Sequence, residues 1–206
     1  IITYACNMNY VVPDELELIE FLLEEVREAS FGTATLVVRL HPTDDRSSSY
    51  IEKFDKSGLP ICFDRPDSGF AAQNTRDIGG FDTILDFVEL MKFSDVVINV
   101  ASTIALDAVL FDTPTICPIF NFNLSPDAWN SAYALHYESS HYRRVVDSGA
   151  VELPSSSQSL SDAINTSINR PSSLKINRHR FCDAMMPDLP TAQLIRDSVK
   201  RTLANC

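Results

Sequence analysis

Short apolar runs alternate with amphipathic stretches along the chain. The apolar runs predict strands at 1–5, 35–40, 59–63, 96–100, 115–119 and 151–153. They are almost continuously apolar, as is typical of parallel strands buried on both faces. Between them, apolar residues recur every three or four positions, which predicts a helix after Pro13 and further helices at 48–57, 82–91, 102–111, from 159 onwards and at 191–203.

The starts of three of these helices have recognisable signals. Asp14 and Glu15 at the front of the first helix suit the positive end of a helix dipole. Asp82 is the predicted N-cap of the third. Ser159, with Asp162 three residues on, resembles a capping box.

Strands that alternate with helices at this spacing indicate βαβ units. We therefore predict one Rossmann-like α/β domain, 1–206, an open parallel sheet of about six strands with helices on both faces. Three connections, 64–81, 120–150 and 170–190, are longer than such units need, and long connections are often functional. The middle one is rich in aromatic residues, which suits either a surface for a partner or ligand, or a loop folded on its own aromatics.

Composition narrows the classes of function. The 206 residues carry a net charge of −11, which disfavours nucleic acid but not a small phosphorylated ligand bound by a local cluster of donors. Five scattered cysteines fit reduced thiols in a cytoplasmic protein better than a disulfide framework, and they form no zinc motif. No apolar run is long enough to span a membrane. Because the chain opens directly on a strand, we expect a fragment of a longer protein.

Ligands of open parallel sheets bind outside the carboxyl ends of the strands. The first such turn contains Asn7 but is not GxGxxG, and the chain has no P-loop motif, so neither dinucleotide nor P-loop chemistry is supported. His41 and Pro42 directly follow the second strand, where an imidazole can donate to a phosphate oxygen. The alternative is a histidine that merely caps the strand.

A second candidate anion site follows the fourth strand. Ser102 and Thr103 open a helix, and free N–H groups at a helix N-terminus bind anions, although Ser102 as a plain N-cap is the simpler alternative. Asp107 lies on the same helix face as Thr103 among apolar residues, where its carboxylate needs a partner. Ribose hydroxyls would supply one, and an exposed helix face is the alternative.

Two segments carry a resemblance to a known family. SDVVINVASTIALDAVLFDTP, at 94–114, resembles the "aD-vv-i-S/T … E-a … G-x-P" signature of the C-terminal domains of GT-B glycosyltransferases. VVRLHP, at 37–42, is similar to the His-Pro motif of bacterial sialyltransferases, polysaccharide capsule transferases and CDP-glycerol glycerophosphotransferases. Two positions depart from the pattern: Asp107 replaces the usual Glu, and Asp112 replaces the usual Gly.

The resemblance implies a nucleotide-sugar donor domain of a metal-independent enzyme for surface polysaccharide or glycolipid synthesis. His41, Ser102 and Thr103 would hold donor phosphate, and Asp107 the ribose. Asn7, Asp64 and Arg65 are expected near the base, while the donor itself, CMP-, CDP-, UDP- or GDP-linked, stays open.

In such enzymes an N-terminal domain supplies the acceptor site, so we expect the isolated domain to be inactive and assign no catalytic base. The helix at 191–203 is expected to pack toward that domain, and the full-length protein is compatible with peripheral membrane association. The alternatives are a sugar-nucleotide 2-epimerase-like domain and a non-catalytic Rossmann-like interaction module.

Overall fold

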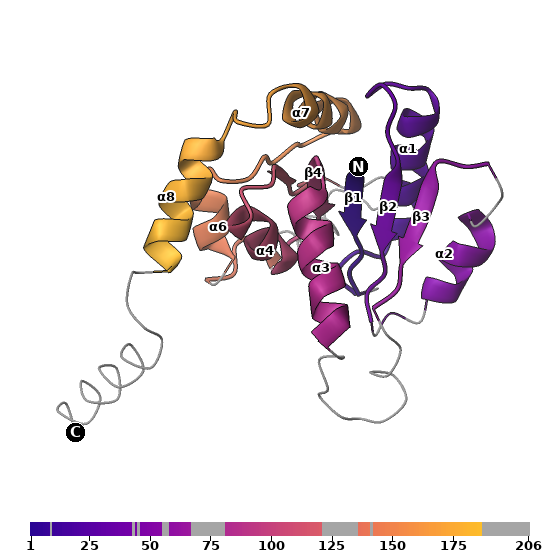
Figure 1. The fold of residues 1–206 in the computed structure, drawn as a ribbon, viewed down its shortest axis with the longest axis horizontal. Helices are drawn as coiled ribbons and strands as arrows, with labels where there is room; N and C mark the ends of the chain where they lie inside the picture. The colour runs from indigo at the N-terminus through magenta and orange to yellow at the C-terminus, as the bar shows by residue number, and fades with distance from the viewer. Residues whose placement is uncertain are drawn as a thin grey trace.

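The computed structural model describes residues 1–8, 10–42, 44, 46–54, 58–66, 81–120, 136–140 and 142–186 (Figure 1). The five strands are β1 (Ile2–Ala5), β2 (Leu36–Arg39), β3 (Ile61–Asp64), β4 (Val96–Asn99) and β5 (Thr115–Ile116). The helices are α1 (Glu15–Arg27), α2 (Ser47–Phe54), α3 (Phe81–Phe93), α4 (Ile104–Leu110), α6 (Arg143–Ser148), α7 (Ser157–Asn169) and α8 (Lys175–Met185).

All five strands are parallel and lie in the order β3-β2-β1-β4-β5. The predicted Rossmann-like α/β class is therefore confirmed. The sixth predicted strand, at 151–153, contributes one parallel bridge between Ile116 and Glu152. Its place beside β5 extends the order in the way expected of a doubly wound sheet.

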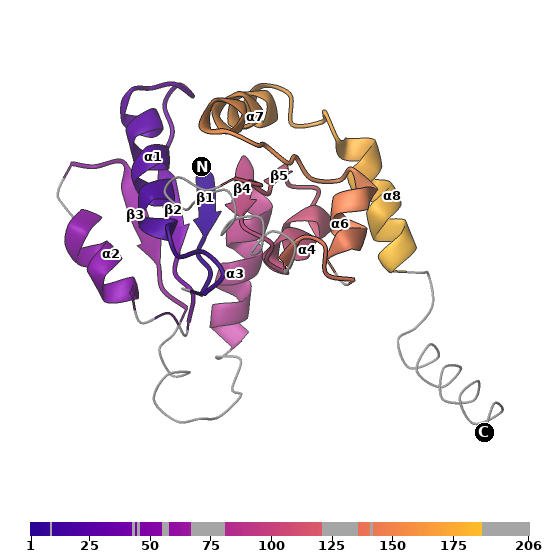
Figure 2. The same ribbon diagram turned by 180° about the vertical axis from the view of Figure 1, so that it is seen from behind.

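Helices pack on both faces of the sheet, and alternate residues of β4 show this directly. Val96 and Ile98 belong to the larger apolar core, which includes the inner faces of α1 and α7. Val97, between them in sequence, belongs to a second cluster with Met91 of α3 and Ala108 of α4. Because side chains alternate across a strand, α3 lies on the face of the sheet opposite to α1 and α7 (Figures 1 and 2).

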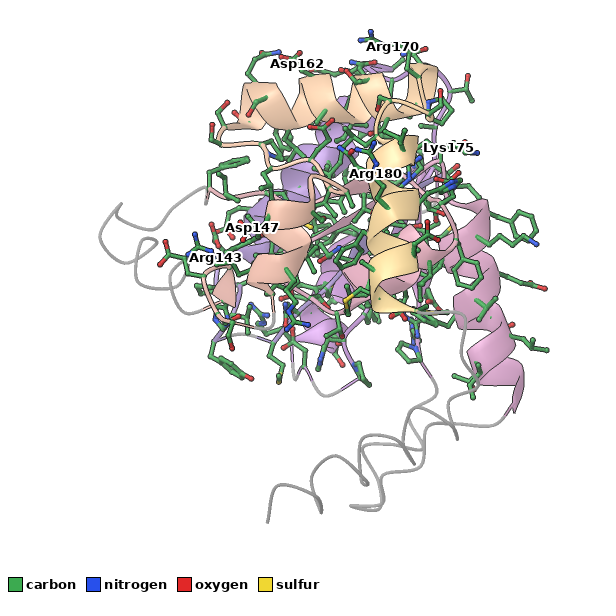
Figure 3. All side chains as sticks on the ribbon, turned by 90° about the vertical axis from the view of Figure 1, so that its left-hand side faces the viewer. Arg143, Asp147, Asp162, Arg170, Lys175 and Arg180 are labelled. Carbon is green, nitrogen blue, oxygen red and sulfur yellow. The ribbon has the colours of Figure 1, made fainter. Side chains whose placement is uncertain are left out.

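After β5, helix α7 covers the sheet, whereas α6 and α8 pack against each other and α8 packs on α4. Figure 3 looks onto these helices and shows α8 beside α6, with α7 across their upper ends. Helices α6 and α8 lie inside the connections at 120–150 and 170–190 and were not predicted. Their patterns are weak because α6 has six residues and α8 buries little besides Arg178.

The aromatic connection behaves, where it is described, as a loop folded on its own aromatics. Tyr137 and Tyr142 are buried and stack edge to face at 5.5 Å between ring centroids. The hydroxyl of Tyr137 donates to the carbonyl of Pro118 at 2.7 Å, and Tyr142 contacts Cys117 Sγ at 3.3 Å. The other aromatic residues of 121–135 lie outside the described residues.

Several helix starts differ from the prediction. The cap of α7 is Ser156, which shares a capping box with Ser159, whereas Asp162 lies a turn inside the helix and accepts from Gln158. Helix α3 begins at Phe81, one residue before the predicted cap, and α4 is shorter than 102–111. The helix predicted at 191–203 lies outside the described residues.

Asp112, the position at which the resemblance led us to expect glycine, has a left-handed backbone, with φ of 59°. Glycine adopts this conformation freely, and aspartate is one of the few other residues that tolerate it. The Asp112 carboxylate also accepts from Arg178 Nε at 2.8 Å and from Lys175 Nζ at 2.9 Å. Aspartate in place of the usual glycine at position 112 therefore adds ion pairs with α8.

Candidate functional site

The direction of winding reverses between β1 and β4, which makes the carboxyl ends of these strands the switch point of the sheet. The registers place Asn99, Ala5, Arg39 and Asp64 in one row across β4, β1, β2 and β3. The candidate residues Asn7 and His41 each lie two residues beyond this row, and Ser102 lies three residues beyond it. The fold thus brings these three predicted residues to one edge of the sheet.

Asn7 joins the two loops at the switch point. Its Nδ2 donates to the carbonyl of Val100 at 2.8 Å, and its Oδ1 accepts from the amide of Met8 at 2.9 Å. The side chain is buried. Asn7 therefore fixes the loop after β4 relative to the loop after β1, a role that its position in the sequence alone did not reveal.

The loop from Val100 to Thr103 has an unusual backbone. Ala101 is left-handed, with φ of 45°, and its amide donates to the hydroxyl of Tyr137 at 3.2 Å. The amide of Ser102 donates to Asn99 Oδ1 at 3.1 Å. Two buried side chains, Asn99 and Tyr137, therefore hold a strained turn of the kind that clusters at ligand sites.

The helix after this turn is a short one. Ser102 Oγ accepts from the amide of Ile104 at 3.4 Å, close to the plain capping role that we weighed against phosphate binding. Within the part of the chain that the structure describes, Asn99 Nδ2 is buried and has no hydrogen-bond partner.

Thr103 is exposed and borders a cleft of about 480 Å³. Its other lining residues are Leu106, Ser140, Tyr142, Arg144, Val145 and Met185. The cleft therefore combines two aliphatic hydroxyls and one guanidinium with apolar walls. Sequence reasoning did not single out Ser140 or Arg144, because the long connection before α6 shows no motif there.

Asp107 is half-buried on α4, and burial raises the pKa of its carboxyl above the ordinary value. No group among the described residues donates a hydrogen bond to it.

His41 follows β2 and is half-buried. Burial lowers the pKa of its imidazole, an effect that the nearby carboxylate of Asp44 partly offsets. The side chain is therefore neutral at pH 7, and one ring nitrogen carries a donor N–H. The carbonyl of His41 accepts from the amide of Asp44 at 3.1 Å, which fixes the turn after the strand.

Asp64 and Arg65 lie at the end of β3, three strands from β4. With a strand spacing of about 4.8 Å, they are about 14 Å from the Ser102 loop. The Asp64 carboxylate forms an ion pair with Arg39, whose guanidinium lies 4.6 Å from the centroid of the Phe87 ring. Arg65 is exposed.

A buried polar cluster near Asn7 was missed by sequence reasoning. Glu15, which we expected to face the dipole at the start of α1, has an exposed side-chain fraction of 0%. Its Oε1 accepts from the amide of Asn7 at 2.7 Å and from the hydroxyl of Tyr4 at 2.8 Å, and its Oε2 contacts Arg46 Nη2 at 3.1 Å. Burial raises the pKa of Glu15 to about 8, although these donors oppose the shift. In the sequence, Asp14 and Glu15 together resemble two exposed acids at a helix start, so nothing indicated that Glu15 is buried.

Among the described residues, no group of three or more His, Cys, Asp or Glu side chains is arranged to hold a metal ion. In the same residues, no helix has both the length and the apolar character needed to cross a bilayer.

No family model and no curated protein matches the sequence. The solved structures that match the chain include the following three. The C-terminal CMP-Kdo binding domain of WaaA from Acinetobacter baumannii has 13% identity and a TM-score of 0.49 over 87% of each chain. The glycotransferase of kitacinnamycin has 10% identity and a TM-score of 0.44, over 87% of this chain and 37% of that one.

The third is the UDP-GlcNAc 2-epimerase of Methanocaldococcus jannaschii in complex with UDP-GlcNAc and UDP. It has 14% identity and a TM-score of 0.50 over 89% of this chain and 44% of the epimerase. This chain thus spans less than half of the length of two of the three proteins. It has a Rossmann-like α/β fold that it shares with part of the UDP-GlcNAc 2-epimerase.

Proposed function

We propose that this chain binds the nucleoside-phosphate part of a nucleotide sugar at the switch point between β1 and β4, as the donor domain of a glycosyltransferase for surface polysaccharide or glycolipid synthesis. The observation that carries the proposal is the pair of loops joined by Asn7 and Val100. One of them has a strained turn that leads into Ser102 and Thr103. The carboxyl edge of the sheet at such a switch point is where open α/β sheets bind ligands.

The chemistry of the surrounding side chains suits a phosphate. Neutral His41 carries a ring N–H, Ser102 and Thr103 have hydroxyls, and Arg144 adds a positive charge in the cleft beside Thr103. A chain with a net charge of −11 repels anions at long range, so a local guanidinium matters for the affinity. The carboxylate of Asp107, four residues beyond Thr103, accepts no hydrogen bond from the described residues and would serve as an acceptor for ribose hydroxyls.

The carboxyl edge of the sheet is long enough to hold the ribose and base of a nucleotide whose phosphates lie at the Ser102 loop. Asp64 and Arg65, about 14 Å from the Ser102 loop along the edge, are at a reasonable distance for a base whose phosphates lie at that loop. We assign them, with Asn7, to the nucleoside end. The acceptor and any catalytic base would belong to an N-terminal domain, which leaves the isolated chain without transferase activity.

The fold likeness favours a second function. The epimerase with a similar fold is known in complex with UDP-GlcNAc and UDP. A sugar-nucleotide 2-epimerase-like domain would use the same nucleotide site. It differs in acting on the sugar without an acceptor, so turnover by the full-length protein separates the two.

Thermal unfolding in the presence of UDP, UMP, CMP, CDP, GDP and TDP tests the proposal. UDP comes first because the epimerase complex contains it. A nucleotide at a hundredfold excess over its Kd stabilises the folded state by about 2.7 kcal/mol. For a domain of this size the melting temperature should then rise by about 5–10 °C.

Two variants of α6 make the test specific. Arg144→Met removes the guanidinium from the cleft and should reduce the shift. Arg143→Met is the matched control, because Arg143 is exposed and its Nε lies 3.5 Å from Asp147 in the next turn (Figure 3). If no nucleotide shifts the melting temperature of the chain or of the full-length protein, the chain is an interaction module and the proposal is wrong.

A further inference from the structure

The loops that carry the proposed ligand-binding residues follow three different strands. Asn7 follows β1, His41 follows β2, and Ser102 follows β4. The ladder hydrogen bonds of the sheet end before these residues. Their relative positions must therefore be set by contacts between the loops themselves.

Arg46, just before α2, makes the largest set of such contacts. Its Nε and Nη2 hold the carboxylate of Asp44 at 2.8–3.1 Å, in the loop that begins with His41. Its Nη1 donates to the carbonyl of Val12 at 3.0 Å, and Nη2 reaches the carbonyl of Asn7 at 3.4 Å. One guanidinium thus ties the loop after β2 to the loop after β1.

Glu15 extends this link. Its two carboxylate oxygens lie between Arg46 Nη2, at 3.1 Å, and the backbone amide of Asn7, at 2.7 Å. Asn7 in turn donates from its side chain to Val100, in the loop after β4. The exposed side-chain fractions are 0% for Glu15, 1% for Asp44 and 19% for Arg46, so water competes little for these contacts.

We propose that Arg46 is a positioning residue of the switch-point site: through Asp44 it sets the His41 loop, and through Glu15 and Asn7 it sets the loop before Ser102. It does so without contacting the ligand. The nucleotide part of this inference rests on the proposed function, whereas the link between the loops does not. The planar fork of an arginine is needed because its acceptors surround it in several directions, and an ammonium group cannot reach all of them at once.

Amide hydrogen exchange of the wild-type chain, Arg46→Lys and Arg46→Met tests the link. Arg46→Lys keeps a positive charge beside the buried side chains of Asp44 and Glu15 and is the variant that should remain folded, while Arg46→Met removes the charge. The control is Arg27→Met, at the far end of α1, where an exposed arginine pairs with Glu24 at 2.8 Å. All measurements are made well below the melting temperature of each variant.

We expect the amides of Asn7 and Met8 to exchange about 10-fold faster in Arg46→Lys, and that of Ser102 to exchange faster to a smaller extent. Strand amides such as that of Ile98 should keep their wild-type rates. Arg27→Met should change none of these amides. If only amides next to residue 46 respond, Arg46 anchors α2 alone and the inference is overturned.

A double-mutant cycle with Asn7→Ala gives the second readout, the affinity for the nucleotide that stabilises the wild type most. Arg46→Lys should weaken binding about 10-fold in the wild type and by a smaller factor in the Asn7→Ala background, since only the route through Asp44 to the His41 loop then remains. Equal effects in both backgrounds would contradict positioning through Asn7. Absence of any nucleotide binding by the wild type would refute the proposed function, and the exchange rates would still decide the role of Arg46.

Discussion

The tie between Asp112 and α8 leads to a quantitative prediction about stability. Arg178 is buried in α8, with 2% of its side chain exposed, and it donates to Asp112 at 2.8 Å and to the carbonyl of Pro171 at 2.8 Å. Truncation of Asp112 to alanine removes the counter-charge but leaves the guanidinium in place. The variant must therefore bury an unpaired charge or displace α8.

The expected loss of stability in Asp112→Ala depends on how deeply Arg178 and Asp112 are buried. Breaking a buried ion pair by removing one partner costs about 3–5 kcal/mol. The side chain of Asp112 is itself 29% exposed, so water can reach part of the gap, and we expect the lower end, about 3 kcal/mol. Alanine also tolerates the left-handed backbone poorly, which costs about 1 kcal/mol relative to glycine. Asp112→Gly should thus be less destabilised than Asp112→Ala by about that amount.

Urea unfolding at pH 7 measures these differences, with Asp147→Ala as the control. Asp147 forms an exposed ion pair on α6, so its removal should cost less than about 0.5 kcal/mol. Asp112→Gly combined with Arg178→Met should be more stable than Asp112→Gly alone, because no charge then stays buried without a partner. The reasoning is refuted if Asp112→Ala lies within about 1 kcal/mol of the wild type, since that is below the cost of an uncompensated buried charge.

Three further predictions concern ligand binding and pH. His41→Ala and Ser102→Ala should each weaken nucleotide binding by about 1–3 kcal/mol, the cost of a lost hydrogen bond to a charged group, and unchanged affinity in both would remove the phosphate assignment. Because the unliganded pKa of His41 is lowered and a bound phosphate favours the imidazolium, binding should tighten as the pH falls below about 6.5, relative to His41→Gln titrated in parallel. Burial raises the pKa of Asp112, but the hydrogen bonds from Lys175 and Arg178 outweigh it and lower the pKa. The pair's stabilisation should be complete above about pH 4 and be lost as the pH falls through the folded-state pKa, so the stabilities of wild type and Asp112→Asn should converge in acid.

The fold was predictable because the hydrophobic pattern directly reports burial. The run 96–100 is apolar except for Asn99, a composition that is typical of a strand covered on both faces. The two helices that were missed, α6 and α8, bury a small part of their surface, and α8 buries an arginine where a pattern search expects an apolar residue. Their stability comes from contacts distant in sequence, such as that between Arg178 and Asp112, which no local pattern contains.

The candidate site was predictable only in part, for a similar reason. Residues that directly follow strands are placed at one edge by topology alone, so Asn7, His41 and Ser102 could be nominated. The residues that hold these three in place could not be predicted from the sequence. From the sequence, Glu15 resembles an ordinary acid in the first turn of a helix, and Arg46 resembles a solvent-exposed cation in a loop. Only the folded sheet brings the two side chains into contact.

The most direct test of the central claim is the location of nucleotide binding, mapped by amide chemical shifts as UDP, or whichever nucleotide stabilises the chain most, is added. The account predicts that the largest changes occur at Asn7, His41 and residues 101–103, with smaller ones at Arg144. Changes concentrated elsewhere would contradict it, for example in the groove between α1 and α2 that is lined by Glu20 and Lys53.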